Sequence, residues 1–491
     1  MSGATAALTI VAIVVLGTIV FALLGVRRLR MDPAQYIVAG RSFGTIFLWV
    51  LLAGEIYTTF TFLGIAGLSY SQGAPSFYVV AYGTCAYIIA YFITPRIWQV
   101  GKSCNLLTGA DFFETRYNSR ALGVGVAVLM FVMIVPYVAI QLSGLQILLR
   151  IAGYGMYNAT VSVCIAFAVL ALFVFSAGLR GTAWASVVKD VLVLAAVIFA
   201  GVAIPMRFFG SPSAMLQRLL EAHPHMLALA PGAAYHGTIW FASTVVLSAI
   251  GFFMGPHSFN AVYSARGADT LRRNAMLLPF YQCFLSLMIF AGLSAAMIVP
   301  GLKGTAVDQS FLLVVQRFYP PWVLGFVAAA GALAALVPAS ALLLGGASVI
   351  TKNVAADAFG IATTPRAQTL LTRILVLVVA LLAVGVWLVA GKTVVELLLV
   401  YYNGISQFFP GVVATFVWPR ATAWGVGAGI VTALLVAVPL AALNISPFGV
   451  NPGLVGFAAN VIVLVVVSLL TIAPINAADA VKPSEPLQVR E

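Results

Sequence analysis

Charged residues are scarce in this chain. Only 8% of its 491 residues are Asp, Glu, Lys or Arg, whereas 62% are hydrophobic, and the mean hydropathy is +1.08. A water-soluble protein of this length has too little interior to hide so much apolar surface. Apolar runs of about 20 residues, each long enough to cross a bilayer, recur along the whole chain. The sequence therefore predicts an all-α polytopic protein embedded in a lipid bilayer.

Cysteine and histidine are also rare, with four of each. Neither residue type clusters at metal-ligand spacing, so the pattern favours small packing residues over a metal centre. The chain has no glycine-rich phosphate loop with a lysine, and its histidines support no Ser–His–Asp arrangement. We therefore expect neither an enzyme nor a cofactor, and no use of ATP.

Basic residues outnumber acidic ones, 25 to 13, but they lie in short loops between the apolar runs. That distribution is typical of membrane topology and not of a nucleic-acid surface. The first basic cluster, Arg27 to Arg30, follows the first apolar run, and no basic segment precedes that run. We therefore expect no cleavable signal peptide, and an N-terminus outside the membrane.

Thirteen spans account for the apolar runs. They lie near residues 5–26, 44–69, 75–98, 121–149, 158–178, 184–208, 237–256, 274–300, 322–350, 367–390, 395–417, 422–444 and 453–475. With the N-terminus outside, 19 of the 25 basic residues fall on the inner side and 6 on the outer side. The asymmetry predicts a multi-pass protein of a bacterial-type inner (plasma) membrane with a cytoplasmic C-terminus. The 476–491 tail is polar, and no loop is long enough to hold a soluble domain.

The odd number of spans leaves room for two five-helix halves of opposite orientation, approximately 44–208 and 237–417. Such inverted repeats place a binding site at the membrane midplane, on broken helices that open each half. The first half has an expected break at Ala53-Gly54-Glu55, and the second has one between Gly251 and Pro256. The sequence thus predicts one transmembrane domain built from two repeats.

Glu55 lies in the middle of an apolar run. A carboxylate at that depth costs at least a few kcal/mol, so it usually marks an ion or substrate path. Nearby Gly54 loosens the helix, and Thr58, Thr59 and Thr61 offer oxygen ligands. The segment therefore indicates a transporter. The alternative is a carboxylate hydrogen-bonded to amides of the helix break, which would only hold the bend.

Four short motifs carry a resemblance to a known family. They are Val38–Gly44; Ala110–Tyr117; Met254–His257 with Tyr263–Arg266 and Arg272-Arg273; and Pro321-Trp322 with Ile350-Thr351. Together they resemble the sodium:solute symporter family, whose members have thirteen helices and the leucine-transporter-type 5+5 inverted repeat. Within that family, Gly54–Thr58 and Pro136–Leu142 are most similar to bacterial monocarboxylate permeases.

The resemblance implies a sodium site between the 44–69 and 322–350 spans. Its carbonyl ligands would come from Gly54, Tyr57 and Ala334, and two hydroxyl ligands would follow at Val337 and Pro338, which have none. Sodium is a hard cation that prefers oxygen ligands, as calcium does. Ser340 would supply one only if the register slipped. The coupling ion therefore stays open between Na⁺ and H⁺, and we expect a proton carried by Glu55.

The same resemblance places four residues at the substrate. Tyr137 and Gln141 are one turn apart and share a helix face, and Gln141 can donate to a carboxylate. Ser248 and Phe252 would line the substrate from the 237–256 span. Packing between helices is the alternative for Tyr137, Gln141 and Phe252.

Two further polar groups have a functional and a structural alternative. The family has an aspartate at Asp190, linked to cation exit, but here Lys189 precedes it and could form an interfacial pair that only anchors the helix end. The second group is a stripe in the 395–417 span, which either faces a cavity or another helix. Its members are Tyr401, Tyr402, Asn403, Ser406 and Gln407.

These features predict a cation-coupled secondary transporter that imports a small organic anion, a short-chain monocarboxylate such as lactate or pyruvate. One alternative is a sodium-coupled symporter of an amino acid such as proline or another small solute. A membrane sensor or a channel are alternatives of a different class. The expected partners are the solute, the coupling cation and the bilayer, with no nucleic acid, and the oligomeric state stays open.

Overall fold

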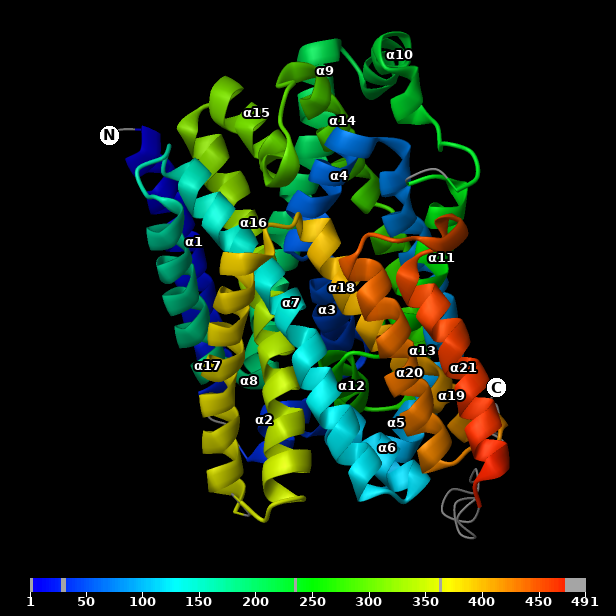
Figure 1. Ribbon diagram of the computed structural model, residues 1–491. Coiled ribbons are helices and arrows are strands. Elements are labelled where there is room, and N and C mark those ends of the chain that lie inside the picture. Colours follow the sequence, from blue (N-terminus) through cyan, green and yellow to red (C-terminus); the bar gives the residue numbers. More distant parts are fainter. Residues whose placement is uncertain (1–2, 28–31, 234–235, 362–363, 473–491) are drawn as a thin grey trace, which may run out of the picture.

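The computed structural model describes residues 3–27, 32–233, 236–361 and 364–472. The described part is a bundle of long helices running along a common direction, with shorter helices at both ends (Figure 1). The sole β contact among the described residues is an isolated bridge between Phe43 and Ala265. The all-α fold class predicted from composition is confirmed.

Ten stretches of helix are long and apolar enough to cross a membrane. Their main helices are α1 (Gly3–Val26), α5 (Tyr78–Ser103), α7 (Arg120–Ala152), the part of α8 (Ala159–Ile198) that begins at Gly178, α13 (Ala268–Gln282) with α14 (Leu285–Ile298), α16 (Pro321–Val349), α17 (Pro365–Ala390), α18 (Val394–Ile405) with α19 (Phe409–Val417), α20 (Ala423–Ala442) and α21 (Pro452–Leu470). Two bent helix pairs and the shorter apolar helix 159–174 complete the set. In the described part of the chain, the ten stretches, the two bent pairs and the one shorter helix correspond to the thirteen predicted spans.

The shorter helices lie at the two ends of the bundle. Helices α9 (Ile204–Phe209), α10 (Pro212–Ala222) and α15 (Ser310–Phe318) lie at the end where the chain begins, whereas α2 (Pro33–Val38) and α6 (Gly109–Tyr117) lie at the opposite end (Figure 1). Within α8, Gly178 has a φ of 58° and interrupts the helix. Glycine alone adopts that conformation at little cost. This interruption separates the two spans predicted near 158–178 and 184–208.

Helix α16 forms the centre of the bundle. Its most apolar 18-residue window is fully buried, compared with 22% for that of α17 at the periphery. Most of its residues are Ala, Gly or Leu, and it packs against α1, α7, α8 and α17. Small side chains allow helices in membranes to approach closely. At Gly345, a Cβ atom would lie 2.5 Å from the backbone nitrogen of His257, so this position has no room for a side chain.

Both predicted broken helices are present. Helix α3 (Thr45–Ile56) is followed by a π-helical turn, η2 (Phe60–Gly64), and by α4 (Ile65–Gln72), with a bend of 49°, whereas α11 (Thr238–Gly251) and α12 (Pro256–Ser264) meet at 51°. The second break lies where Gly251 and Pro256 predicted it. The first does not: Gly54 and Glu55 remain in the last turn of α3, and the chain leaves the helix at Tyr57, whose φ and ψ are −91° and 91°. Glycine alone is not enough to end a helix, and the break falls at the threonine-rich segment that follows.

The four sequence motifs meet in two pairs. Phe43 of the first motif donates its N–H to the Ser264 carbonyl (3.0 Å) and accepts from the N–H of Arg266 (2.8 Å), both of the third motif. Asp111 of the second motif accepts from Asn353 Nδ2 (2.6 Å) and pairs with Lys352 Nζ (3.2 Å), just after the fourth motif. These contacts of the motifs therefore fasten helix ends together.

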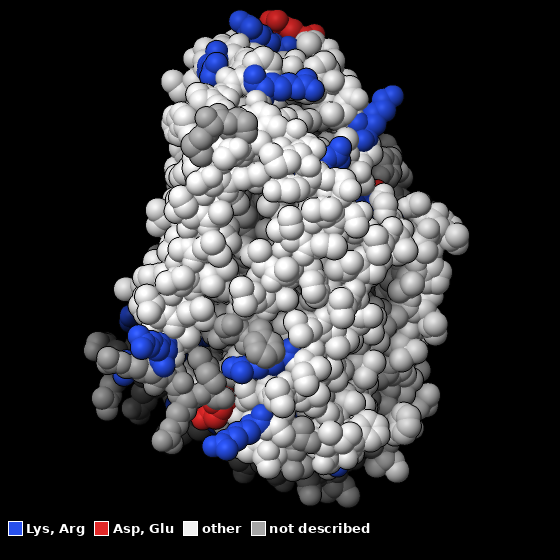
Figure 2. All heavy atoms as spheres, turned by 90° about the vertical axis from the view of Figure 1, so that its left-hand side faces the viewer, with Lys and Arg blue, Asp and Glu red and all other residues white. Residues whose placement is uncertain are grey.

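Charged and apolar surfaces are separated along the bundle. Figure 2 shows Lys and Arg gathered toward the two ends of the molecule, with a broad band free of charged side chains between them. Large apolar side chains are exposed along the long helices, for example Ile13 (66%), Leu172 (64%) and Leu435 (70%). An apolar belt of this kind is the surface that a hydrocarbon core would cover.

The 304–309 turn, η6 (Gly304–Gln309), ties α4 to the start of α18. Asp308 Oδ2 accepts a hydrogen bond from the N–H of Val394 (3.0 Å). Burial, the largest cause, and the nearby Glu396 raise the pKa of Asp308, whereas the Val394 hydrogen bond lowers it; the net value is about 7. Because the unfolded value is about 3.9, the folded state holds a proton that the unfolded state releases between these two pH values.

We expect the protein to be less stable at pH 8 than at pH 5. The contribution of Asp308 is fully present below about pH 4 and is lost as the pH rises through the folded value. Asp308→Asn keeps the size of the side chain and should flatten this part of the pH profile. Thermal unfolding of the purified protein in detergent checks it, and identical pH slopes for the variant and the parent would contradict it.

The charge distribution also predicts the sidedness of two loops. In a cysteine-free background, a membrane-impermeant maleimide should label Ala228→Cys in intact cells, because we expect the 207–236 segment outside. Asp269→Cys should react only after permeabilisation, because we expect residues 257–273 inside. Labelling of both positions from the same side would rule out the thirteen-span arrangement.

Candidate functional site

The break in α3 exposes backbone carbonyls that a lysine satisfies. Lys189 Nζ donates to the Gly54 carbonyl (2.6 Å) and the Tyr57 carbonyl (3.1 Å), and lies 3.0 Å from Asp190 Oδ1. The side chain of Lys189 is completely buried, with 0% exposed. A charge so deep is stable only when oxygen ligands surround it. Three oxygens from α3 and α8 provide them here.

The amides of the same break have partners as well. The N–H of Thr58 donates to Thr61 Oγ1 (2.7 Å), and that of Thr59 donates to Gln141 Oε1 (3.3 Å). In a membrane interior no water replaces a lost backbone hydrogen bond. The break is therefore stabilised by side chains, one of which reaches it from α7.

This geometry corrects the structural alternative for Lys189 and Asp190. The two residues do not form an interfacial pair at a helix end, because both are buried and the ammonium binds the break in α3. Lys189 was one of the 19 basic residues expected on the inner side; because it is buried, 18 of the remaining 24 are expected there. The signal that it missed was a lysine within an apolar span, which is as informative as the acid at Glu55.

The predicted sodium-binding positions on α16 lack side-chain oxygens, as expected. Ala334, Val337 and Pro338 are all buried. Pro338 has no N–H, so the Ala334 carbonyl one turn earlier lacks its usual helical donor. Ser340 donates to the Val337 carbonyl (2.7 Å) and lies 2.6 Å from Thr182 Oγ1. Its hydroxyl is thus engaged between α16 and α8.

Glu55 is not held by the amides of the helix break. Those of Thr58 and Thr59 bond elsewhere, and Glu55 Oε1 is buried without a hydrogen-bond partner among the described residues. Its carboxylate interacts electrostatically with Lys189 and with Tyr137. The hydrogen-bonded alternative for Glu55 is therefore not what the structure contains.

The predicted substrate residues border an aromatic cluster. The Tyr137 ring lies 4.8 Å from that of Tyr401 and 6.0 Å from the His257 ring, centroid to centroid. On the other side, the half-buried Phe252 ring lies 5.7 Å from Tyr87. The cluster joins α7 and α18 to the α11–α12 break, which borders it directly. The α3 break is joined to it through Gln141, which lies one turn from Tyr137 and accepts from the Thr59 amide.

Several buried polar atoms around this cluster have no protein partner among the described residues. They are Glu55 Oε1, Thr59 Oγ1, Tyr87 OH, Gln141 Nε2, Ser248 Oγ, His257 Nδ1 and Tyr401 OH. Buried polar groups are nearly always hydrogen-bonded, so such atoms usually face a ligand or ordered water. Most of them can donate a proton, and apolar rings lie beside them. The arrangement suits a small solute with an acceptor group.

His257 and Tyr87 were missed by sequence reasoning. Neither has a metal-type neighbour, and the described residues contain no group of three His, Cys, Asp or Glu side chains able to hold a metal. The position of His257 directly after Gly255-Pro256, at a predicted helix break, was the available signal. Nothing in the sequence around Tyr87 distinguishes it from other aromatic residues of the apolar spans.

The polar stripe of the 395–417 span divides between two roles. Tyr401 and Tyr402 belong to the aromatic cluster, with ring centroids 5.4 Å apart. Gln407 instead donates to the Gly453 carbonyl (3.0 Å) of α21, and Ser406 donates to the Leu247 carbonyl (2.9 Å) of α11. Asn403 packs against Gly453. The amide part of the stripe therefore faces neighbouring helices.

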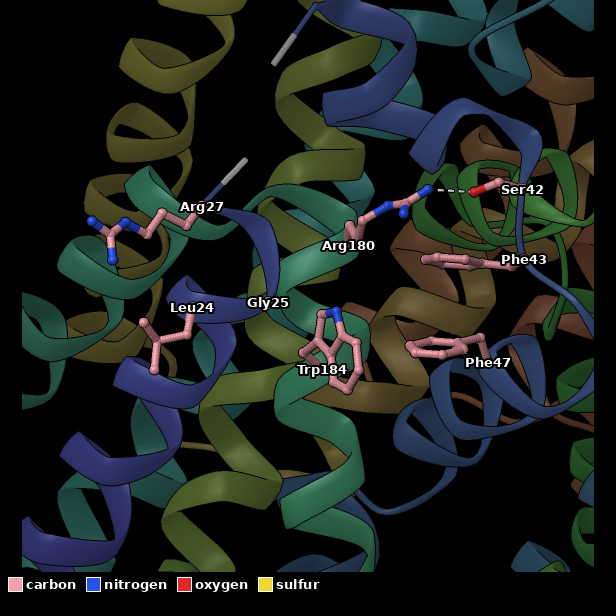
Figure 3. Close-up of a pocket in the computed structure, with 8 residues that line it drawn as sticks. All are labelled: Leu24, Gly25, Arg27, Ser42, Phe43, Phe47, Arg180 and Trp184. Carbon is pink, nitrogen blue, oxygen red and sulfur yellow. Dashed lines mark hydrogen bonds between the residues drawn. The ribbon is translucent and has the colours of Figure 1, made fainter. Parts of the chain in front are cut away.

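A cavity of about 890 Å³ lies apart from the predicted site, beside the end of α1 and the start of α3 (Figure 3). Arg180 reaches across it to the hydroxyl of Ser42, with Trp184 one turn further along α8. None of the predicted site residues lines it. Lys189 lies five residues beyond Trp184 on α8, about 7.5 Å along the axis, so the cavity is on the side of the α3 break that we expect to face the cytoplasm.

Comparison with known proteins agrees with this geometry. The sodium:solute symporter family profile matches residues 36–443. The uncharacterized symporter YhjB of Bacillus subtilis is 36% identical, with 94% of this chain and 96% of YhjB aligned. A monocarboxylate transport permease of Rhizobium johnstonii is 30% identical (90% and 91% covered), and the high-affinity proline transporter PutP of Bacillus subtilis is 23% identical (90% and 94%).

Among solved structures, an outward-open Na⁺-coupled sialic acid symporter superimposes with a TM-score of 0.80 at 13% identity, covering 95% of this chain and 98% of that one. This likeness supports the leucine-transporter-type fold. Proteins of the matched family are secondary transporters that use no cofactor and are not enzymes. The match over residues 36–443 and the 36% identity to YhjB show that this chain belongs to the sodium:solute symporter family.

Proposed function

We propose that this cation-coupled symporter imports a short-chain monocarboxylate, such as lactate or pyruvate. The observation that carries the proposal is the set of unpartnered donors between the two broken helices, above all Gln141 Nε2 and the Tyr401 hydroxyl. A carboxylate accepts hydrogen bonds from just such groups. The adjacent rings of Tyr137 and Phe252 would contact the short apolar part of the solute.

The monocarboxylate permease of Rhizobium johnstonii supports the same solute class, because 90% of this chain aligns with it. A proline-like amino acid is the second candidate, favoured by the 23% identity to PutP. Uptake of labelled lactate separates the two. Unlabelled pyruvate should suppress it and unlabelled proline should not; the reverse would favour the amino acid.

In this proposal, the halves 44–208 and 237–417 move against each other around the aromatic cluster. The N-terminus would lie outside the inner membrane and the C-terminus in the cytoplasm; the 476–491 tail lies outside the described residues. Because the solute is an anion, the membrane potential drives its entry only if the co-transported cations outnumber its charge.

Gln141 tests how the carboxylate is held. Gln141→Leu should raise the apparent Km for lactate about tenfold, since a lost hydrogen bond to a charged group costs about 1.5–3 kcal/mol. Gln146→Leu is the matched control, because five residues along the helix place it about 140° away. Transport assays at equal expression measure both variants, and an unchanged Km for Gln141→Leu would remove Gln141 from the site.

Glu55 tests the coupling. If its carboxylate carries a proton, Glu55→Gln should abolish accumulation driven by a pH gradient but spare exchange of labelled for unlabelled solute, because exchange needs no proton release. Glu221→Gln, an exposed carboxylate on α10, is the control and should behave as the parent. Concentrative uptake by Glu55→Gln in liposomes would show that Glu55 has a structural role.

A further inference from the structure

We infer that the ammonium of Lys189 takes the place of a sodium ion at the break in α3, so that this symporter carries a tethered cation where its family is expected to bind sodium. The inference deepens the proposed function and rests on its symport mechanism, but not on the identity of the solute. It concerns the coupling site formed by Gly54, Tyr57 and α16.

Lys189 Nζ contacts the oxygens that a sodium ion would be expected to bind. The resemblance to the family assigned sodium to the carbonyls of Gly54 and Tyr57, and these are the two carbonyls that Lys189 Nζ binds, at 2.6 and 3.1 Å. An ammonium carries one positive charge and three N–H donors. Its third neighbour is Asp190 Oδ1 at 3.0 Å. The lysine thus supplies the charge and the coordination that a monovalent cation would otherwise provide.

The space beside Gly54 is occupied. An added Cβ at Gly54 would lie 2.7 Å from Ser186 Oγ and 3.5 Å from Lys189 Nζ. The ammonium is covalently attached to α8 and has no exposed surface. A sodium ion could reach these carbonyls only after the lysine side chain had been withdrawn.

The α16 side of the expected sodium site lacks oxygen ligands. Val337 and Pro338 occupy the positions of two hydroxyl ligands and bring no oxygen, and Ser340 is engaged by Thr182. The expected hydroxyl ligands are missing, and an ammonium occupies the carbonyls. Both differences make the binding of sodium less favourable, and together they leave no complete set of oxygen ligands for it.

The charged and polar groups near Lys189 come from α8 and α3. Asp190 lies on α8, Glu55 lies in the last turn of α3, and Tyr57 directly follows it. Tyr281 of α13 contacts Tyr57, because its carbonyl accepts from the Tyr57 hydroxyl (3.3 Å). The Asp190 carboxylate, 3.0 Å away, offsets the charge of the ammonium. A movement of α3 relative to α8 would separate these carbonyls from Lys189, so this lysine connects the helix break to α8.

Direct binding of ²²Na⁺ to the purified full-length protein, without any solute, tests the inference. We expect no saturable binding to the parent protein. The double variant Lys189→Ser with Val337→Ser replaces the ammonium with a hydroxyl and restores a hydroxyl on α16. It should show saturable binding at millimolar sodium. Saturable binding by the parent protein would overturn the inference, and so would a folded double variant that binds no more sodium than the parent.

A stability measurement covers the case in which the double variant does not fold. Lys189→Ala should be thermally destabilised in choline chloride and stabilised again when sodium chloride replaces it at equal ionic strength, because an ion that binds only the folded state raises its stability. Lys352→Ala, which removes another ion-paired lysine, is the matched control and should show no sodium-specific gain. A sodium effect of equal size in the parent protein, Lys189→Ala and Lys352→Ala would overturn the inference.

Neither measurement includes a transported solute, so an error in the proposed solute cannot change its outcome. Conversely, a protein that binds no sodium but fails to transport lactate or pyruvate would contradict only the proposed function.

Discussion

The structure depends on how the break in α3 is satisfied inside an apolar bundle. An interrupted helix exposes carbonyls and amides, and the hydrocarbon region offers no water to bond them. Here Lys189 from α8 binds two carbonyls, and Gln141 from α7 accepts from one amide. The irregular segment is thereby fixed between two neighbouring helices. A polar region at this depth is stable because its backbone groups are paired, while several side-chain atoms beside it are left for a ligand.

The centre and the ends of the bundle use different chemistry. Around the break, the small residues of α16 let helices approach closely, so that the polar groups are enclosed. At the end opposite the N-terminus, backbone hydrogen bonds of Phe43 and the contacts of Asp111 with Lys352 fasten segments far apart in sequence. Most of the residues in the motifs that identify the family make these fastenings. His257, at the end of the third motif, is the exception, because its ring lies beside Tyr137.

The candidate site unites groups that the sequence keeps far apart. Tyr137, His257 and Tyr401 come from three different helical segments and meet in one aromatic cluster. Donors without partners beside apolar rings suit a small carboxylate. The Lys189 ammonium gives the site a fixed positive charge, because it is part of the chain and cannot leave with the solute.

Local sequence was enough to predict the spans, the break between Gly251 and Pro256, and the family. Length and hydrophobicity decide which segments can cross a bilayer, and both are local properties; Gly251 and Pro256 likewise mark a break by their own backbone chemistry. The assembled fold sets which groups meet. It placed the first break at Tyr57, joined Lys189 to Gly54 across 135 residues, and turned Gln407 toward α21 and Tyr401 toward the site. Such contacts depend on the packing of whole helices, and no spacing within a single segment encodes them.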